Sequence, residues 1–325
     1  MNYKLILPTG SNLVQEFTSI PHGVTSLDLS WNNLDSISTT ELMQAFAKIP
    51  ASVTSLNLRG TKLSNKSSDE LVQILATIPA NITSLNLSAN SLRSKSDTEL
   101  AQFLAATPTS VTSLNLSGNY LGYNNNSELA RLLAAIPISV TALDLSWNSL
   151  SSTSGSELAH AFAAIPGSVT SMDLSANFLG LKSCSELAHV FSSVPNHVIS
   201  LNLYLNYLQR LSLENLVFLK DSLKHLQTVY LGHDSVKSMS KEQCHALRAL
   251  FPHIQKIILV DKDGKEIHPS QSLTIANLIR ELSGKADAPS LLNQCILFAQ
   301  KHQTNIDYLN IPEELKESIL TFNPH

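Results

Sequence analysis

The sequence has few cysteines, no excess of basic residues and no long apolar run. Its 325 residues include only three cysteines, Cys184, Cys244 and Cys295, which are far apart. This spacing fits neither a disulfide framework nor a metal site, so we expect a protein of a reducing compartment. The formal net charge is −4 and the Lys and Arg residues are scattered. A nucleic-acid partner is therefore not expected, because phosphate binding needs a basic patch.

No apolar run is long enough to span a membrane, and the apolar stretch Leu5–Leu7 is too short for a secretory signal. We therefore expect a soluble protein without a membrane partner. The sequence also has no glycine-rich phosphate loop and no Ser/His/Asp or Cys/His set in a recognisable motif. These absences favour a protein that is not an enzyme and that needs no cofactor.

What the sequence does contain is one motif repeated every 29 residues. The motif has the form V-T-S-L-(D/N)-L-x-x-N and begins at Val24, Val53, Ile82, Val111, Val140, Val169 and Val198. A fixed period of this length indicates one supersecondary unit stacked on copies of itself. In the first unit Val24, Leu27 and Leu29 alternate with polar residues, which predicts a short strand with one apolar face.

An asparagine ends each predicted strand, and a helix follows. The asparagines are expected to bond backbone groups that the bend leaves open. They are Asn32, Asn90, Asn119, Asn148, Asn177 and Asn206. Thr61 interrupts the series, and Asp234 is expected to take the same place in the eighth unit. Each helix is predicted to end at a proline such as Pro166 and to begin with a capping box. The box pairs are Ser38 and Glu41, Ser67 and Glu70, Ser96 and Glu99, Asn125 and Glu128, Ser154 and Glu157, and Ser183 and Glu186.

The pattern L-x-x-L-x-L-x-x-N-x-L resembles the leucine-rich repeat family, and a period of 28–29 residues with a full helix resembles its ribonuclease-inhibitor subclass. The resemblance implies an α/β solenoid shaped like a horseshoe, with a parallel sheet inside and helices outside. We interpret residues 1–23 as an N-terminal capping half-repeat, residues 24–268 as the repeats, and residues 269–325 as an all-α C-terminal region.

A horseshoe of this kind presents the polar strand positions on its concave face, where we expect a target protein to bind. Most of these positions carry small Ser and Asn residues, and the exceptions are aromatic or charged. Exposed aromatic and Arg side chains are the usual anchors of interfaces. The predicted target-binding residues are Asp28, Trp31, Arg59, Asp144, Trp147, Asp173 and Tyr204. The alternative is that the tryptophans only cover the edge of the sheet.

Two patterns are reminiscent of metal sites but favour other interpretations. The segment Asp261–Gly264 lacks the remaining ligands of a calcium loop, so a β-hairpin turn is expected there. His160 and His189 lie one repeat apart at an outward helix position that is Gln or Arg in other repeats. We interpret this column as a solvated helix face. The sequence therefore predicts no metal site.

The last part of the chain lacks the repeat pattern and is predicted to form three helical stretches, Ser272–Leu282, Ser290–His302 and Pro312–Phe322. Their simplest role is to cap the last repeat. Residues 290–299 also resemble the BC box that opens a SOCS box, with Leu291, Cys295 and Ala299 on one helical face. The resemblance implies that these residues bind an apolar pocket of Elongin C.

Residues 309–319 resemble the cullin box that forms the second half of a SOCS box. The cullin-binding residues implied by this resemblance are Ile311, Pro312, Leu315 and Ile319. Asn310 replaces the first proline of the box and Ser318 replaces its aromatic residue, so recruitment of Elongin B/C is better supported than recruitment of a cullin.

The two boxes together imply a non-catalytic adaptor that links a target on the repeats to an Elongin B/C–cullin ubiquitin ligase. The alternative is a plain leucine-rich repeat binding or inhibitory module whose C-terminal helices only cap the solenoid. The near-identical Ser- and Asn-rich units also resemble effectors that intracellular bacteria inject into host cells. Glu313, Glu314 and Glu317 resemble a type IV secretion signal, although an exposed helix face gives the same pattern. These resemblances imply action in the host cytosol.

Overall fold

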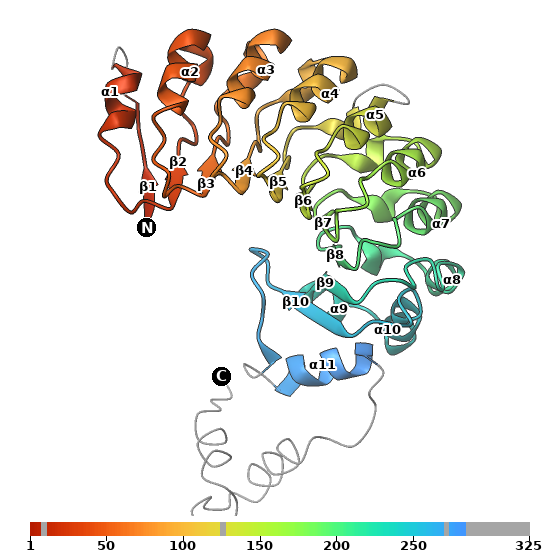
Figure 1. Cartoon of the computed structure of the whole chain (residues 1–325). Coiled ribbons are helices and arrows are strands. Elements are labelled where there is room, and N and C mark those ends of the chain that lie inside the picture. Colours follow the sequence, from red (N-terminus) through yellow and green to blue (C-terminus); the bar gives the residue numbers. More distant parts are fainter. Residues whose placement is uncertain (8–11, 124–127, 270–272, 284–325) are drawn as a thin grey trace, which may run out of the picture.

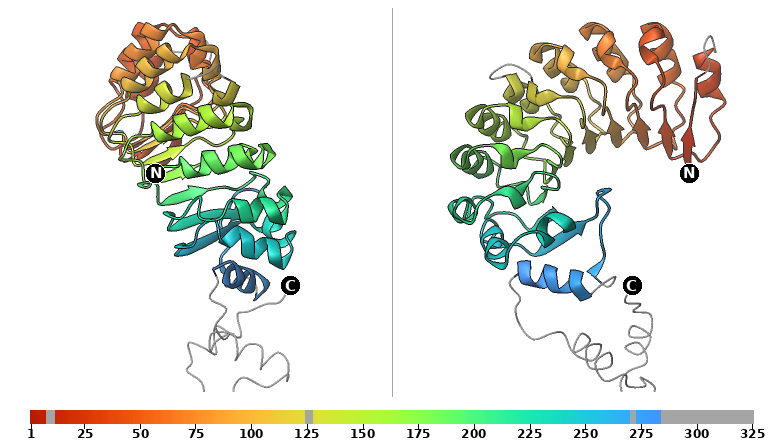
Figure 2. Two further views of the ribbon diagram at one scale, coloured as in Figure 1. Left: turned by 90° about the vertical axis from the view of Figure 1, so that its right-hand side faces the viewer. Right: turned by 180° about the vertical axis from the view of Figure 1, so that it is seen from behind.

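The computed structural model describes residues 1–7, 12–123, 128–269 and 273–283, and shows a curved array of strands and helices (Figure 1). In this described part, ten strands form one parallel sheet in which β1 to β10 follow each other in sequence order. The sheet lines the inside of the arc and most helices lie outside it (Figures 1 and 2). The α/β solenoid predicted from the sequence is confirmed.

Each of the first eight strands is short and is followed by a turn and a helix. The strands are β1 (Asn2–Lys4), β2 (Ser26–Asp28), β3 (Ser55–Asn57), β4 (Ser84–Asn86), β5 (Ser113–Asn115), β6 (Ala142–Asp144), β7 (Ser171–Asp173), β8 (Ser200–Asn202), β9 (Thr228–Gly232) and β10 (Lys256–Val260). The α-helices are α1 (Leu13–Thr18), α2 (Thr39–Phe46), α3 (Ser68–Ala76), α4 (Asp97–Ala105), α5 (Glu128–Ala134), α6 (Gly155–Ala163), α7 (Cys184–Ser192), α8 (Leu213–Phe218), α9 (His233–Lys237), α10 (Lys241–Arg248) and α11 (Leu273–Ser283). Short 3₁₀ helices follow the strands at η1 (Leu34–Ser36), η2 (Leu63–Asn65), η3 (Leu92–Ser94), η4 (Leu121–Tyr123), η5 (Leu150–Ser152), η6 (Leu179–Leu181) and η7 (Leu208–Arg210).

The strands pair so that equivalent residues of successive repeats are neighbours. Leu27 pairs with Leu56, and Leu56 pairs with Leu85. All three side chains are buried in a core that runs through the whole array between the sheet and the helices. A core of this kind is stable only as a stack, because each repeat buries its apolar face against its neighbours.

A ladder of buried asparagines joins the turns that follow the strands. The side-chain amide of Asn148 donates to Leu116 O (3.1 Å) and Leu145 O (3.0 Å), and its Oδ1 accepts from Asn119 N (3.0 Å) and Leu121 N (3.3 Å). Equivalent bonds are made by Asn90, Asn119 and Asn177. The predicted role of these residues is confirmed, and each also ties its own repeat to the preceding one.

Thr61 takes the asparagine position in the second repeat, and the turn before it is different. Its hydroxyl donates to Asn90 Oδ1 (3.1 Å). The backbone amide of Asn32 donates to Leu29 O within its own turn (3.3 Å). Asn33 has a φ of −81°, whereas the equivalent residues of later repeats are left-handed. The Asn32 side chain still donates to Leu5 O (2.8 Å) and accepts the Leu7 amide (2.8 Å), so the ladder is interrupted between the first and second repeats.

Asp234 does not continue the ladder, and this prediction was wrong. The residue lies in α9, its side chain is exposed, and its carboxylate contacts His233 Nδ1 at 2.9 Å. Strand β9 runs on to Gly232 and passes directly into α9. The turn that a ladder residue would support is therefore missing from this repeat.

The predicted helix caps are present in most repeats. Complete capping boxes start four helices in which the sequence predicted them, at Ser67, Ser96, Ser154 and Ser183. Ser38 caps α2 without the reciprocal bond from its glutamate. Asn125 lies outside the described residues, so the box predicted there stays a prediction.

The glutamates of the caps have a second role that the sequence pattern did not reveal. Glu70 accepts a bond from the hydroxyl of Thr39, the first residue of the preceding helix (2.5 Å). Glu99 accepts the hydroxyl of Ser68 in the same way. Hydrogen bonds lower the pKa of both carboxyls from 4.5 to about 2. The largest contribution comes from Thr39 at Glu70 and from Ser68 at Glu99. One carboxylate therefore caps its own helix and holds the start of the preceding one.

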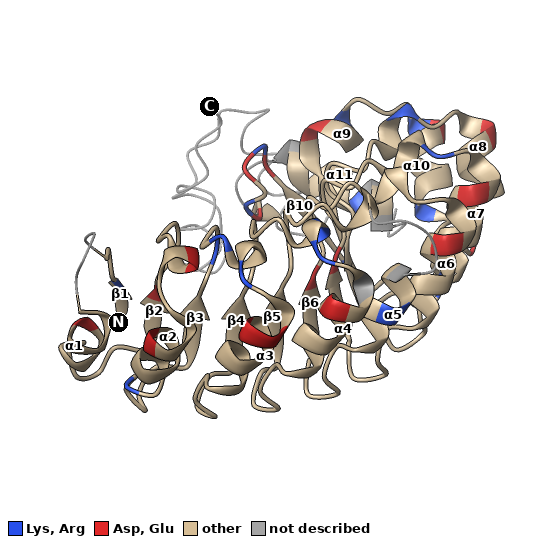
Figure 3. Cartoon of the chain, turned by 90° about the horizontal axis from the view of Figure 1, so that it is seen from above, with Lys and Arg blue, Asp and Glu red and all other residues tan. Residues whose placement is uncertain are grey.

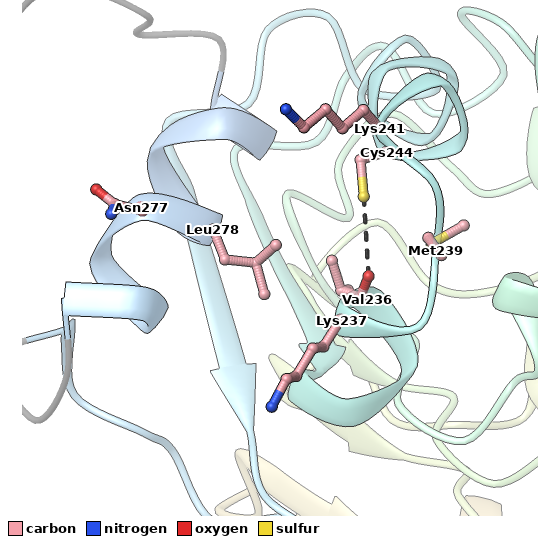
Figure 4. A pocket seen from close by; sticks show the side chains of 7 residues that line it. All are labelled: Val236, Lys237, Met239, Lys241, Cys244, Asn277 and Leu278. Atoms are coloured by element: carbon pink, nitrogen blue, oxygen red, sulfur yellow. Dashed lines mark hydrogen bonds between the residues drawn. The ribbon is translucent and has the colours of Figure 1, made fainter. Parts of the chain in front are cut away.

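Helix α11 closes the described end of the array by packing against β10 and α10. Its side chain Leu278 points toward Val236 and Cys244, while Asn277 points away from them (Figure 4). This helix confirms the predicted stretch Ser272–Leu282. The other two predicted helices, Ser290–His302 and Pro312–Phe322, lie outside the described residues.

The segment after β10 forms the predicted β-hairpin turn. Val260 forms an antiparallel bridge with Glu266, and the Gly264 amide donates to Asp261 O (3.0 Å). The Asp261 carboxylate accepts the amides of Asp263 and Lys265 (2.9 Å each). This carboxylate therefore holds the turn together.

Candidate functional site

Three of the predicted target-binding residues are aspartates at the ends of strands on the concave face. Asp28, Asp144 and Asp173 are half-buried at the ends of β2, β6 and β7. Each carboxylate accepts the backbone amide two residues further on, from Ser30 (2.9 Å), Ser146 (2.9 Å) and Ser175 (2.7 Å) respectively. Asparagine makes the same bond in other repeats, for example at Asn86 and Asn115. Part of the role of these aspartates is therefore to shape the turn.

Asp144 and Asp173 place two carboxylates side by side in the middle of the concave face. They are directly paired in the register of β6 and β7. Burial, followed by the charge of Asp173, raises the pKa of Asp144, and the opposing effect of Arg59 does not cancel this. A cationic group of a bound protein would relieve the repulsion.

The two tryptophans lie on the turns that follow β2 and β6, and both are largely exposed. Trp31 is 63% exposed and Trp147 is 58% exposed. Arg59 lies over the Trp31 ring at 5.6 Å from its centre, and a side chain at Gly60 would overlap that ring. The structure thus brings Trp31 and Arg59 together across two neighbouring repeats.

The tryptophans occupy a backbone conformation that L-residues rarely adopt. Trp31 has a φ of 64° and Trp147 a φ of 56°. The equivalent residues Gly60 and Gly118 have φ values of 64° and 65°. A non-glycine residue in this left-handed region costs about 1 kcal/mol or more. The turn itself therefore has no need of a tryptophan.

Tyr204 is the predicted site residue with the most internal contacts. Its hydroxyl donates to Lys262 O (2.8 Å), and its ring lies against Gly232 and Gly264. Burial, and then the charges of Asp261, Asp263 and Asp234, raise the pKa of Tyr204. Tyr204 therefore holds the hairpin after β10 against the concave face, whatever contact it makes with a target.

The comparisons with known proteins agree with this architecture. A family model described as a leucine-rich repeat matches residues 24–37 and 138–159. No curated protein matches the chain. Among solved structures, the leucine-rich repeat-containing protein LegL7 from Legionella pneumophila is 63% identical, with a TM-score of 0.72; the alignment covers 90% of this chain and 100% of that chain.

The chain belongs to the leucine-rich repeat family. The leucine-rich repeat resemblance of the sequence is thus confirmed, and the ribonuclease-inhibitor subclass stays a prediction. About a tenth of this leucine-rich repeat protein has no counterpart in the matched LegL7 chain.

A second set of large residues on this leucine-rich repeat array was missed in the sequence. Tyr120, Phe178 and Tyr207 share one turn position and are left-handed, with φ values of 60°, 59° and 58°. Phe178 stacks on Tyr207 with 5.2 Å between ring centres, and Arg210 lies over Tyr207 at 4.4 Å. Tyr123 follows Tyr120 and carries Arg93 over its ring at 5.3 Å.

We call the exposed or half-exposed aromatic residues on these turns the aromatic rim. Its members are Trp31, Tyr120, Tyr123, Trp147, Phe178 and Tyr207. The sequence signal for Tyr120, Phe178 and Tyr207 is their shared repeat position, two residues beyond that of the tryptophans. The other repeats carry Asn33, Lys62, Ser91 and Ser149 at this position. Aromatic and Arg side chains gathered along one edge of the sheet are typical of protein-binding surfaces.

Other kinds of site find no support among the residues that the structure describes. No three His, Cys, Asp or Glu residues in that part come together to hold a metal ion. None of the described helices is long and apolar enough to cross a bilayer. Basic residues are dispersed over the array (Figure 3). The absence of enzymatic activity stays a prediction, although repeats of this family typically serve as interaction modules.

The residues predicted to bind the ubiquitin ligase cannot be placed. Those for Elongin C are Leu291, Cys295 and Ala299, and those for a cullin are Ile311, Pro312, Leu315 and Ile319. All lie within residues 284–325, outside the described part of the chain. Both interactions therefore stay predictions from sequence.

Proposed function

We propose that this leucine-rich repeat protein binds a target protein across the aromatic rim and the adjoining concave face. One observation carries the proposal. Trp31 and Trp147 are exposed at left-handed positions where Gly60 and Gly118 serve the same turn. Since the fold is better served by glycine there, a binding role explains the large side chains.

The acidic pair next to the rim suggests the chemistry of the target. Asp144 and Asp173 are paired in the register of β6 and β7, and the charge of Arg59 offsets only part of the rise in the Asp144 pKa. Trp147 lies three residues beyond Asp144. An Arg side chain of the target would pair with the carboxylates and stack on the tryptophan. The chain already contains one such Arg–Trp stacking contact, because Arg59 lies over Trp31.

The test is affinity capture from a eukaryotic host-cell lysate with the full chain, quantified by mass spectrometry. Trp147→Gly removes the ring but keeps the backbone that other repeats use. Ala89→Gly is the matched control, because Ala89 has the same left-handed φ of 55° without a large side chain. We expect specific proteins to bind the unmutated chain and the control, and to be lost from Trp147→Gly. An identical set of bound proteins for all three chains would refute the proposal.

We further propose that the protein acts as a bacterial effector inside a host cell. The 63% identity to a Legionella pneumophila protein supports a bacterial source for this chain. The resemblance of its Ser- and Asn-rich units to injected effectors supports the place of action. A translocation assay with a reporter fused to the full chain tests this directly. A signal that persists in a strain lacking the type IV secretion system would contradict the predicted route.

The finer proposal is an adaptor that brings its target to an Elongin B/C–cullin ubiquitin ligase. Its support is the BC-box and cullin-box resemblance of residues 290–319. Co-expression with Elongin B/C followed by gel filtration should give a complex that is lost in Leu291→Pro/Cys295→Phe. Absence of a complex with the unmutated chain eliminates the adaptor. A plain binding or inhibitory module would then remain, and loss of capture by Trp147→Gly would still support it.

A further inference from the structure

The outer face of the array changes character at α8. In six earlier repeats one outward helix position is polar and exposed, at Gln44, Gln73, Gln102, Arg131, His160 and His189. In α8 the same position is Phe218, which is 63% exposed. An exposed phenylalanine at a position that is otherwise polar breaks the amphipathic pattern of these helices.

Two further apolar residues of α8 are exposed beside Phe218. Val217 is 56% exposed and Leu213 is 42% exposed. Leu213 is the first residue of its helix, and the equivalent residues of other helices are Thr39, Ser68, Asp97, Gly155 and Cys184. Three neighbouring apolar residues at outward positions form a patch of the kind that a bound segment covers.

A groove lies between this patch and α10, which packs against α8. It has a volume of about 360 Å³. Leu213 and Val217 line it from α8, and Ala246 and Ala249 line it from the side of α10. The lining also includes Lys220, Glu242 and His245. A narrow apolar groove between two helices suits the apolar face of a third helix.

The chain itself offers an occupant close by. Helix α11 packs on the other side of α10, and its C-terminal end lies next to α10 in both views (Figures 1 and 2). Residues 284–290 follow and can span about 23 Å when extended. Packed helices lie about 10 Å apart, so a groove on the far side of α10 is roughly 15 Å away. The sequence then continues with Leu291, Cys295 and Ala299, spaced for one helical face.

We propose that residues 290–302 dock in the groove between α8 and α10, with Leu291 and Cys295 against Leu213 and Val217. The docked segment covers Leu213 and Val217, the part of the patch that lines the groove. It also hides the two side chains that the SOCS-box resemblance assigns to Elongin C. Docking in the groove and binding to Elongin C would use the same side chains, so they exclude each other. The segment would stay docked until a partner competes for it. The docking itself does not depend on Elongin binding.

Alkylation of Cys295 in the full chain, measured by peptide mass mapping, tests the proposal. We expect Cys295 in the unmutated chain to react at least about tenfold more slowly than in urea, which corresponds to a docked fraction above about nine-tenths. Leu213→Ser/Val217→Lys should restore the fast rate. The control is Ile138→Lys, which changes an 83% exposed apolar residue far from the groove and should leave Cys295 protected.

Other occupants give different results. Fast alkylation of the unmutated chain, or protection that survives Leu213→Ser/Val217→Lys, overturns the proposal. Protection that is lost on dilution points to a second copy of the chain and also overturns it. A photo-crosslinker in place of Phe218 should give a product of monomer mass that maps to residues 290–302. A crosslink between two chains, or to residues outside that segment, would contradict the assignment.

Discussion

The asparagine ladder predicts a large loss of stability from a single truncation, Asn148→Ala. The Asn148 side chain is fully buried and bonds five backbone groups. Two of these are the amides of Asn119 and Leu121, which donate to its Oδ1. An orphaned buried donor costs about 1–3 kcal/mol. With two amides left unbonded we expect a loss of about 3–5 kcal/mol, a large part of the stability of an ordinary domain.

Urea unfolding followed by circular dichroism measures this loss, and thermal unfolding should shift down by about 10 °C. Ser152→Ala is the control, because Ser152 is exposed in η5 of the same repeat and should change stability by less than about 0.5 kcal/mol. Asn148→Asp keeps the acceptor but loses the three donated bonds and buries a charge, so its loss of stability should grow as the pH rises. A cost below about 1 kcal/mol for Asn148→Ala would refute the reasoning, because the amides would then have found other partners.

Two further predictions concern titrating groups. The pKa of Glu70 and Glu99 is about 2 in the folded chain and 4.5 ordinarily, so their stabilising effect is complete above pH 4.5 and disappears as the pH falls toward 2. The variant Glu70→Gln/Glu99→Gln should therefore lose less stability than the unmutated chain across that pH range. An unchanged acid transition would contradict this. The raised pKa of Asp144 means that its ionised form destabilises the fold, so Asp144→Asn should gain about 0.5 kcal/mol at pH 7. That gain should vanish below the ordinary carboxyl range, and thermal unfolding at pH 7 and pH 3.5 would show whether it does.

The repeat pattern was sufficient to predict the solenoid because several kinds of signal recur together. Alternation at Val24, Leu27 and Leu29 predicted the strand, and Ser67 with Glu70 predicted the helix start. These features are local, so a few residues decide them. The pairing of each strand with the next then follows from the period alone.

Features that depend on contacts between repeats were harder to predict. The bond from Thr39 to Glu70 joins residues 31 positions apart, and a capping motif read within one helix gives no sign of it. The same holds for the stacking of Phe178 on Tyr207, since the residues belong to different units. Asp234 was misplaced because β9 is longer than the earlier strands and changes the turn that follows.

The interface predictions had a different outcome. Trp31 and Trp147 proved exposed, and Arg59 was found over Trp31. Tyr204 proved to be engaged with the hairpin after β10. A polar strand position indicates only which face a side chain is on, and what covers that face depends on segments far away in sequence.

The threonine at position 61, where other repeats have an asparagine, affects the order in which the repeats unfold. The first unit is joined to the second by the sheet, the apolar core and bonds such as Asn57 to Asp28, but without the asparagine ladder. From the second unit onward the ladder is present, because the Asn90 side chain bonds Leu58 O and the Leu63 amide. Since the junction between the first and second units lacks the ladder, the N-terminal unit should exchange its amide hydrogens first and be trimmed first by proteases. The concave surface near Trp147 would persist as a shorter, intact arc that keeps Arg59, whereas Trp31 lies on the side that is lost.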